Sequence, residues 1–367
     1  MGLPLHSRMR QKIKNGLNTL LVSLFQKEAR HEPIPADEIK RILVIRINYR
    51  IGNILFTTPL LRALEQRFPE ASMDILIGAA YPASLLKGFS TVRNVFDFPR
   101  KLLKNPYAAY QYIQHLRANH YDLVINLNTG SASDRGAAFL ARGTYKLGFD
   151  AEGNWSPSTH VVPVPTGIVH EALKPLYLMH AFGNHPTDFP QKMDIALSES
   201  EKKQGLEELK KRLLAQGYTW GSKEKIIGMF RDARFEKKID NAWWEAWYAQ
   251  MKHLNPNTLF IDILSPDVTE KLSEELYTLM ESNLRQLGAI LSQMDAFVCG
   301  DTGPMHLASA SGVPTIALFK ASAPALYGTL GIHDRSLTLS GSTPEMIALQ
   351  ITEHLASLPA VGEASAR

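Results

Sequence analysis

The sequence predicts an α/β protein built of two doubly wound domains with a cleft between them. Short β-rich runs alternate with helical segments in two successive series, the pattern of strand–helix–strand units that form parallel sheets. The 367 residues exceed what one ordinary core holds and suit two domains. Ligands of such domains bind at the carboxyl ends of the strands. We therefore expect a site where the two sheets face each other.

The two series are separated by helical sequence. The first series has the expected strands "RILVIRI" (41–47), "MDILIGA" (73–79), "NVFDF" (94–98), "DLVINLN" (122–128) and "YKLGF" (145–149). The second has "KIIGMF" (225–230), "TLFIDIL" (258–264), "AFVCG" (296–300), "TIALF" (315–319) and "SLTLS" (336–340). Two stretches with helical character, 167–183 and 198–217, lie between them. We expect a first domain over 39–190, a second over 191–358 and a tail over 359–367.

Residues 1–38 form a basic amphipathic arm and a linker. Apolar residues in the arm recur at steps of three and four, which predicts one helical face over about 8–27. Two interpretations stay open: the helix docks on its own domain, or it lies in an anionic membrane surface. Two prolines in "HEPIPADE" then end the helix.

Composition excludes several classes of protein. The net charge of +4 does not suggest a dedicated nucleic-acid binder. No apolar run reaches the roughly 20 residues of a membrane-spanning helix. Cys299 is the only cysteine, so no intrachain disulfide can form, which suits a reducing cytoplasm. We expect a cytoplasmic protein, with the inner face of the plasma membrane as the place where the arm would bind.

The stretch "CGDTGPMHLASASGVP" (299–314) predicts an anion site. A strand ends at Gly300, a turn follows, and Pro304 is suited to the first turn of a helix. The free N–H groups and the positive end of that helix would face the cleft, where they bind phosphate. Gly303 carries no side chain to block a phosphate. The alternative is an ordinary strand–helix turn with a capping residue, in which His306 is a buried core histidine.

Together these stretches resemble family 9 glycosyltransferases, the ADP-heptose:lipopolysaccharide heptosyltransferases and their relatives. The resemblance runs through "ILVIRINYRIGNILFTTPLLRALEQRFPEASMDILI", "YDLVINLNTGSASDRGAAFLARGTYKLGFD", "HEALKPLYLMHAFG" and "LRQLGAILSQMDAFVCGDTGPMHLASASGVPTIALF". It implies a GT-B fold, with the acceptor in the N-terminal domain and the nucleotide-sugar in the C-terminal domain. It also implies inverting transfer without a metal or cofactor, by default of heptose from ADP-heptose to a core-oligosaccharide or lipid-linked acceptor.

The resemblance assigns the donor site. Asp301 would hydrogen-bond the donor sugar, and the backbone amides of Thr302 and Gly303 would bind its phosphates. His306 would neutralise or position the same group. A lysine after the first strand of the second domain reaches the donor phosphate in the family, and Lys237 fits that spacing better than Lys238. The alternative for both lysines is a solvated basic loop.

The resemblance also raises a difficulty at Gly52–Asn53. The family usually has Gly-Asp here, and that aspartate is the expected general base, whereas an amide cannot take a proton at neutral pH. Three hypotheses follow. Another group serves as base, with Asp134, His170 and a donor phosphate oxygen as candidates; or the donor or acceptor differs; or the chain is a catalytically impaired module that only binds nucleotide-sugar.

Two further departures concern the donor pocket. "FIDILSPDVTEKL" (260–272) replaces a Gly-Gly-Pro-type turn of the family, and Lys320 follows "ALF" where the family usually has glycine. A rival class, the dinucleotide-dependent oxidoreductases, needs G-x-G-x-x-G after a strand. The first strand leads instead into "NYRIGN", which lacks that pattern.

Overall fold

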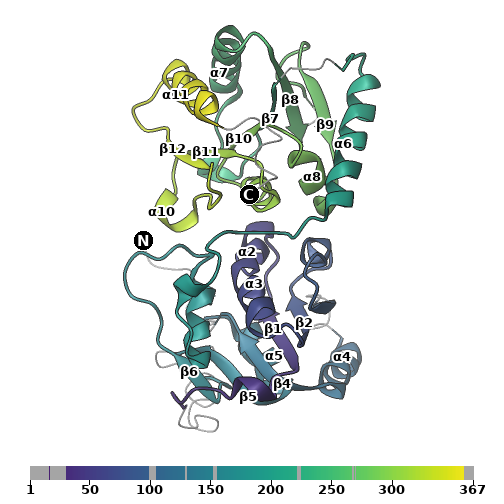
Figure 1. The fold of residues 1–367 in the computed structure, drawn as a ribbon, viewed down its shortest axis with the longest axis vertical. Coiled ribbons are helices and arrows are strands. Elements are labelled where there is room, and N and C mark those ends of the chain that lie inside the picture. Colours follow the sequence, from purple (N-terminus) through teal and green to yellow (C-terminus); the bar gives the residue numbers. More distant parts are fainter. Residues whose placement is uncertain are drawn as a thin grey trace.

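The computed structural model describes Gly16 and residues 30–98, 105–128, 130–151, 155–220, 225–266, 268 and 270–358. It consists of two six-stranded parallel sheets, one above the other in Figure 1, each with helices on its faces. The predicted two-domain α/β architecture is therefore confirmed. The predicted amphipathic helix over 8–27 and the tail over 359–367 lie outside the described residues, Gly16 excepted.

The first sheet has the order β3-β2-β1-β4-β5-β6, with every neighbouring pair parallel. Its strands are β1 Arg41–Arg46, β2 Ser72–Ile77, β3 Val92–Asp97, β4 His120–Asn126, β5 Arg142–Phe149 and β6 His160–Val162. The second sheet repeats this order as β12-β11-β10-β7-β8-β9. Its strands are β7 Lys225–Phe230, β8 Thr258–Leu264, β9 Tyr277–Met280, β10 Ala296–Gly300, β11 Thr315–Phe319 and β12 Arg335–Thr338. This is the strand order of dinucleotide-binding folds.

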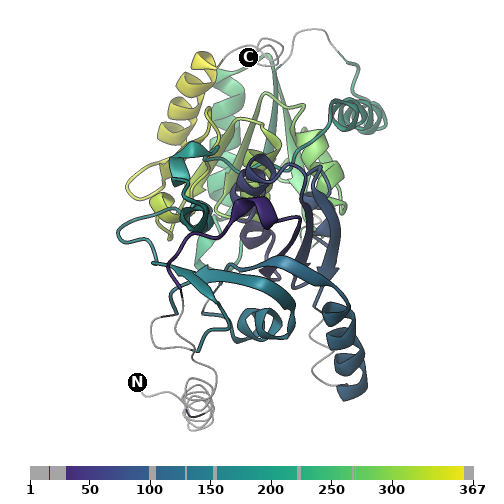
Figure 2. The ribbon, with the colours of Figure 1, turned by 60° about the horizontal axis from the view of Figure 1, so that its bottom comes forward.

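Helices cover the sheets, as the two views in Figure 1 and Figure 2 show. They are α2 Ile51–Leu55, α3 Thr58–Arg67, α4 Pro106–Ala118, α5 Ala132–Leu140, α6 Glu199–Leu214, α7 Asn241–Leu254, α8 Leu284–Leu291, α9 Gly303–Ser311, α10 Pro324–Tyr327 and α11 Pro344–Ser357. Short 3-10 helices are η1 Ala36–Glu38, η2 Ala83–Leu86, η4 Lys174–Phe182, η5 Pro186–Asp188 and η6 Phe235–Lys237. Within the described part of the chain, no helix is both long and apolar enough to cross a bilayer.

The sequence explains where these elements begin and what they bury. In α6 the Ser198 side chain accepts the Glu201 N–H while Glu201 bonds back to the N-cap, which satisfies two backbone donors at the start of the helix. Strands β1 and β10 are buried on both faces, as expected for parallel strands between helices. Aromatic side chains of α7 pack against the second sheet and α11, and Trp244 and Trp247 are fully buried there.

The structure differs from prediction in three elements. Strands β6 and β9 were not expected, because three or four residues are too short for an alternation of apolar and polar residues to appear. The expected helix over 167–183 is instead a turn followed by the 3-10 helix η4, which ends at Gly183 in the left-handed conformation (φ 77°). Pro175, near the start of η4, has no N–H to donate within the helix.

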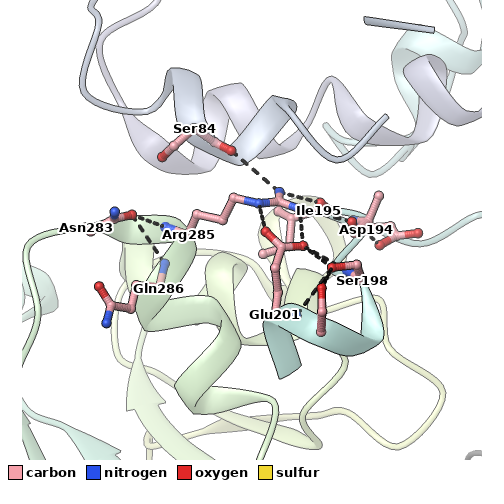
Figure 3. A network of polar contacts seen from close by, with 10 residues as sticks. Ser84, Asp194, Ile195, Ser198, Glu201, Asn283, Arg285 and Gln286 are labelled. Carbon is pink, nitrogen blue, oxygen red and sulfur yellow. Dashed lines mark hydrogen bonds and ion pairs between the residues drawn. The ribbon is translucent and has the colours of Figure 1, made fainter. Parts of the chain in front are cut away.

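An arginine of the second domain braces the connection between the two sheets (Figure 3). Arg285 of α8 donates to the Ile195 carbonyl (2.8 Å) and the Ala196 carbonyl (3.1 Å) of the connecting segment. It also pairs with Glu201 and reaches the Ser84 carbonyl of the first domain at 3.5 Å. Hydrogen bonds from Arg285 lower the pKa of Glu201 to about 2. The connection is thus held by a charged side chain and three backbone carbonyls. The boundary at 190/191 stays a prediction.

Candidate active site

The two sheets bring their switch points toward each other. A switch point lies where the chain reverses its winding direction, between β1 and β4 in the first sheet and between β7 and β10 in the second. Helix α2 follows β1 and helix α9 follows β10, and these helices pack against each other across the two domains (Figure 1). Asn53 and Asp301 belong to these two segments. The expected site residues of both domains therefore lie where α2 meets α9, a contact that we call the interdomain seam.

Asp301 is the centre of the donor side. It lies one residue beyond β10 and is only 6% exposed. Its carboxylate forms an ion pair with Lys237 at 2.6 Å and accepts a hydrogen bond from Ser322. Three loops, which follow β7, β10 and β11, thus meet at one carboxylate. A buried carboxylate requires such partners, because an unpaired buried charge is costly.

A buried ion pair fixes the loop that carries Lys237. Arg231 binds Asp262 through Nε and Nη2, at 2.8–3.2 Å, and also donates to Asn241 and the Glu270 carbonyl. The predicted competitor Lys238 is exposed, and its carbonyl accepts a hydrogen bond from Lys320 at 3.0 Å. Of the two lysines, the structure places Lys237 beside Asp301.

Helix α9 begins at Gly303 with Thr302 as its N-cap. No side chain caps this end, and Pro304 occupies the first turn, so backbone N–H groups and the positive end of the helix are directed at the seam. The bare side of Gly303 faces Ile51 of α2, where an added Cβ would lie 3.4 Å from the Ile51 Cβ. This is an ordinary van der Waals distance, so the contact with Ile51 does not by itself require glycine, and the expected role of Gly303, an open path for phosphate, stays a prediction.

His306 lies on α9 against the other domain. It is buried, its ring meets Phe56 edge to face at 4.7 Å, and its Nδ1 has no hydrogen-bond partner. Burial lowers the pKa of His306 to about 3, against the opposing effect of the Asp301 charge. The imidazole is therefore neutral at pH 7. A neutral imidazole favours positioning over charge neutralisation among the two roles expected for His306, and both roles stay predictions.

Gly52 packs closely against His306 across the seam. A Cβ at this position would lie 2.6 Å from the His306 Cδ2 atom, so only glycine fits without movement. The neighbouring Asn53 is half-buried in α2, and its side-chain amide has no protein partner among the residues that the structure describes. An amide with unused donors and acceptors can orient a hydroxyl group but cannot deprotonate it.

Asp134 lies at the switch point of the first sheet. It is 0% exposed, accepts the Ile47 N–H at 3.3 Å and accepts the Ser131 hydroxyl at 2.7 Å. Burial raises the pKa of Asp134 to about 6, although the Ser131 hydrogen bond and the charge of Arg46 oppose this. The carboxyl group holds the loop after β1 in place, and it is enclosed rather than open to a substrate.

His170, another candidate base, is fully engaged. Its Nδ1 accepts the Ala172 N–H at 3.1 Å, so its Nε2 carries the proton and donates to the Gly328 carbonyl at 3.0 Å. Neither ring nitrogen is free to take a proton from an acceptor. The histidine instead joins the first domain to the loop after α10.

Two residues that follow β2 and β7, Tyr81 and Phe235, were not identified from the sequence. Tyr81, exposed in the first domain, donates its hydroxyl to the Tyr49 carbonyl at 2.5 Å. Burial raises the pKa of Tyr81, and the positive charge of Arg234 in the second domain opposes this. The next residue, Phe235, is 85% exposed with φ 56°. A bulky residue in the left-handed region is strained, and such residues concentrate at functional sites. No local sequence pattern marks either residue.

The described ranges contain no group of three or more His, Cys, Asp or Glu side chains arranged to hold a metal ion.

Comparisons with known proteins agree on one family. The family profile "Glycosyltransferase family 9 (heptosyltransferase)" matches residues 109–357. Lipopolysaccharide heptosyltransferase 3 of Escherichia coli is 27% identical over 74% of this chain and 80% of its own length. Lipopolysaccharide core heptosyltransferase OpsX of Haemophilus influenzae is 19% identical over 78% of this chain and 81% of its own.

Solved structures show the same fold. A family 9 glycosyl transferase from Veillonella parvula superposes with a TM-score of 0.68 at 18% identity, covering 92% of this chain and 93% of its own. The E. coli heptosyltransferase WaaC with ADP gives 0.67 at 19% identity, covering 86% and 99%. Both confirm the GT-B fold expected from the resemblance. Because the family profile spans more than half of the sequence, this chain belongs to glycosyltransferase family 9 and is a glycosyltransferase.

Proposed function

We propose that this protein is an inverting, metal-independent heptosyltransferase that moves heptose from ADP-heptose onto a lipopolysaccharide-core or related glycan acceptor. The observation that carries the proposal is the interdomain seam, where the Lys237–Asp301 ion pair and the start of α9 meet α2. In this proposal residues 39–190 hold the acceptor and residues 191–358 hold the donor. Relatives that act on lipopolysaccharide, and a fold relative that binds ADP, support the choice of substrates.

The donor side would work by charge and position. Lys237 and the N–H groups of Thr302 and Gly303 would bind the diphosphate, and Asp301 would receive hydroxyl groups of the sugar. A helix N-terminus and a lysine stabilise the negative charge that develops as the nucleoside diphosphate leaves, which is the role a metal plays elsewhere. Neutral His306 would hold this turn against Gly52 without adding charge.

The acceptor side must dispose of one proton. The acceptor oxygen attacks the anomeric carbon, the bond from that carbon to the phosphate oxygen breaks, and ADP leaves with the bonding electrons. Asn53 would orient the acceptor hydroxyl, but its amide cannot take the proton. Asp134 is enclosed and His170 is engaged, so a phosphate oxygen of the departing ADP is the base that fits best. A missing carboxylate base typically costs about 10²–10⁴ in rate rather than all activity.

Two alternative functions would also explain why Asn53 stands where the family usually has aspartate. The donor or acceptor could differ from those of the relatives, since Lys320 lies near the donor turn and bonds to the loop of Lys237. The chain could also be a catalytically impaired module that binds nucleotide-sugar without turnover. Both alternatives use the same donor site.

We also propose that the protein works in the cytoplasm, at the inner face of the plasma membrane when its acceptor is lipid-linked. The basic residues of the arm over 8–27 support this placement, because anionic lipids attract such segments. No nucleic-acid partner or cofactor is proposed.

The test is a transfer reaction with ADP-heptose and a heptose-deficient core acceptor, followed by mass spectrometry of the product. Transfer should survive a chelating agent, and nuclear magnetic resonance of the new linkage should show the inverted anomer. Transfer only from a nucleotide-sugar other than ADP-heptose would show that the donor differs from that of the relatives. Donor binding without any product across the donors tested would select the binding module.

A further inference from the structure

A basic cavity lies at the end of the first sheet where its strands begin, on the side away from the seam. It has a volume of about 500 Å³ and is bordered by the first residues of β4 and β5 and by the ends of α4 and α5. Its lining residues are Arg117, His120, Phe139, Leu140, Ala141, Arg142, Gly143 and Lys146. Figure 1 shows β4 and β5 at the end of the molecule remote from the second domain.

The cavity gathers positive charge without balancing it. No carboxylate is among its lining residues, and none of Arg117, Arg142 and Lys146 has an ion-pair partner within the described part of the chain. Burial lowers the pKa of Lys146, and the charge of Arg117 lowers it further, so these cations are close enough to repel. Like charges held together in this way indicate an anionic ligand.

Part of this charge is fixed in place by the fold. The Lys146 Nζ donates to the carbonyls of Ala138 at 2.8 Å and Phe139 at 3.0 Å, which are backbone acceptors near the end of α5. Arg117 and Arg142 are exposed at the rim, where their planar guanidinium groups can bind phosphate oxygens in pairs. The cavity therefore combines a rigid ammonium group at its wall with two adaptable guanidinium groups at its mouth.

An apolar side chain accompanies the cations. Phe139 is 44% exposed while its ring meets Trp155 at 6.0 Å. An exposed aromatic ring beside basic residues is typical of surfaces that contact the interface of a bilayer. A site for a free phosphate ion needs the cations but has no use for this ring.

The chain enters the fold beside the same strands. Arg30, the first residue of the range 30–98, pairs in parallel with His160 of β6. The Arg30 N–H donates to the Thr159 carbonyl, and Thr159 accepts the Lys146 N–H through its hydroxyl. Residues 8–27, which precede this point, carry Arg8, Arg10, Lys12, Lys14 and Lys27.

From this cluster we infer that the cavity binds the phosphate of an anionic lipid headgroup and docks the enzyme on a membrane with its cleft facing away. The choice of a lipid rests on the proposed function, because a lipid-linked acceptor is what brings the enzyme to a membrane. Strand β4 has seven residues at about 3.3 Å each, which places the seam about 20 Å from this edge. Such spacing suits an acceptor hydroxyl carried on an oligosaccharide above the lipid.

Vesicle sedimentation of the full chain tests this inference. The protein should bind vesicles that contain phosphatidylglycerol and not vesicles of phosphatidylcholine alone. The Arg117→Gln/Arg142→Gln variant should bind about thirtyfold more weakly, since each cation near an anionic surface contributes about a factor of five. The matched control Lys203→Gln/Lys211→Gln removes two exposed cations from α6 and should bind like the wild type.

Three outcomes would overturn the inference. Full binding by the Arg117→Gln/Arg142→Gln variant would assign the membrane contact to the arm alone. Saturable calorimetric binding of soluble glycerol phosphate without vesicle binding would make the cavity a small-molecule site. Binding of an RNA oligonucleotide without vesicle binding would assign it to another partner.

The test is separate from that of the proposed function. Vesicle binding needs no sugar donor, so it can fail while transfer succeeds. Transfer to a soluble acceptor should be unchanged in the Arg117→Gln/Arg142→Gln variant, because both residues lie at the far edge of the sheet. Loss of transfer to the soluble acceptor at an unchanged melting temperature would contradict the assignment, since it would tie these arginines to catalysis.

Discussion

Replacing Gly52 with alanine should cost this enzyme far more activity than stability. The new Cβ would lie 2.6 Å from the His306 Cδ2 atom, whereas carbon atoms in contact prefer about 3.5–4.0 Å. His306 is buried and its ring already meets Phe56, so it has little room to retreat. Helices α2 and α9 must therefore separate by about 1 Å. A misplacement of that size in an active site costs about a hundredfold in rate.

The effect on stability should be much smaller. Overpacking costs about 1–3 kcal/mol, while alanine gains about 0.5–1 kcal/mol over glycine inside a helix. The net loss should be about 1 kcal/mol. Nucleotide release at saturating substrates measures the rate, and thermal unfolding measures stability.

A second glycine in the first domain supplies the control. Gly136 of α5 has open space where a Cβ would be added, so Gly136→Ala should keep full activity and gain a little stability. Unchanged activity in Gly52→Ala would refute the expectation that transfer depends on the spacing between α2 and α9. An equal loss of activity in Gly136→Ala would mean that the assay reports general disturbance of the domain.

Three other predictions follow from the same geometry. Asn53→Asp should keep or raise the rate and add an ionisation to the pH–rate profile if this position faces the acceptor; an unchanged profile would place it elsewhere. Because burial raises the pKa of Asp134 to about 6, its ionisation opposes folding, so stability should fall by up to about 3 kcal/mol as pH rises from about 4 to 6. The free energy of unfolding of Asp134→Asn, measured in urea, should not fall with pH over this range. A fall equal to that of the wild type would exclude Asp134 as its source. Arg285→Ala removes the brace on Ile195 and Glu201 and should destabilise the protein by about 1–3 kcal/mol in urea unfolding, whereas an unchanged midpoint would show that the brace is dispensable.

The predictable parts of the site are those whose local structure depends on residues adjacent along the chain. Asp301 follows directly after a buried strand, and Pro304 opens the next helix, so the turn between them could be identified without a partner domain. The resemblance to the family selected Lys237 by its spacing from the preceding strand, and the structure places it 2.6 Å from Asp301.

The parts that were not predictable depend on contacts between distant segments. His306 is neutral because α2, which lies about 250 residues earlier, encloses it. His170 bonds to Gly328, 158 residues away, and its proposed role as a base could not be rejected without that contact. The clustering of Arg117, Arg142 and Lys146 likewise depends on how two helices end beside two strands.

Calorimetric titration with ADP tests whether a nucleoside diphosphate binds where Lys237 meets Asp301. Lys237→Met should weaken ADP binding by about tenfold to a hundredfold, the size of a lost charge-assisted hydrogen bond. Lys238→Met is the matched control, since that neighbouring lysine is exposed and has no contact with Asp301. ADP affinity should fall in Lys237→Met alone; equal ADP affinity in Lys237→Met and the wild type would exclude the ion pair of Lys237 with Asp301 from the donor site.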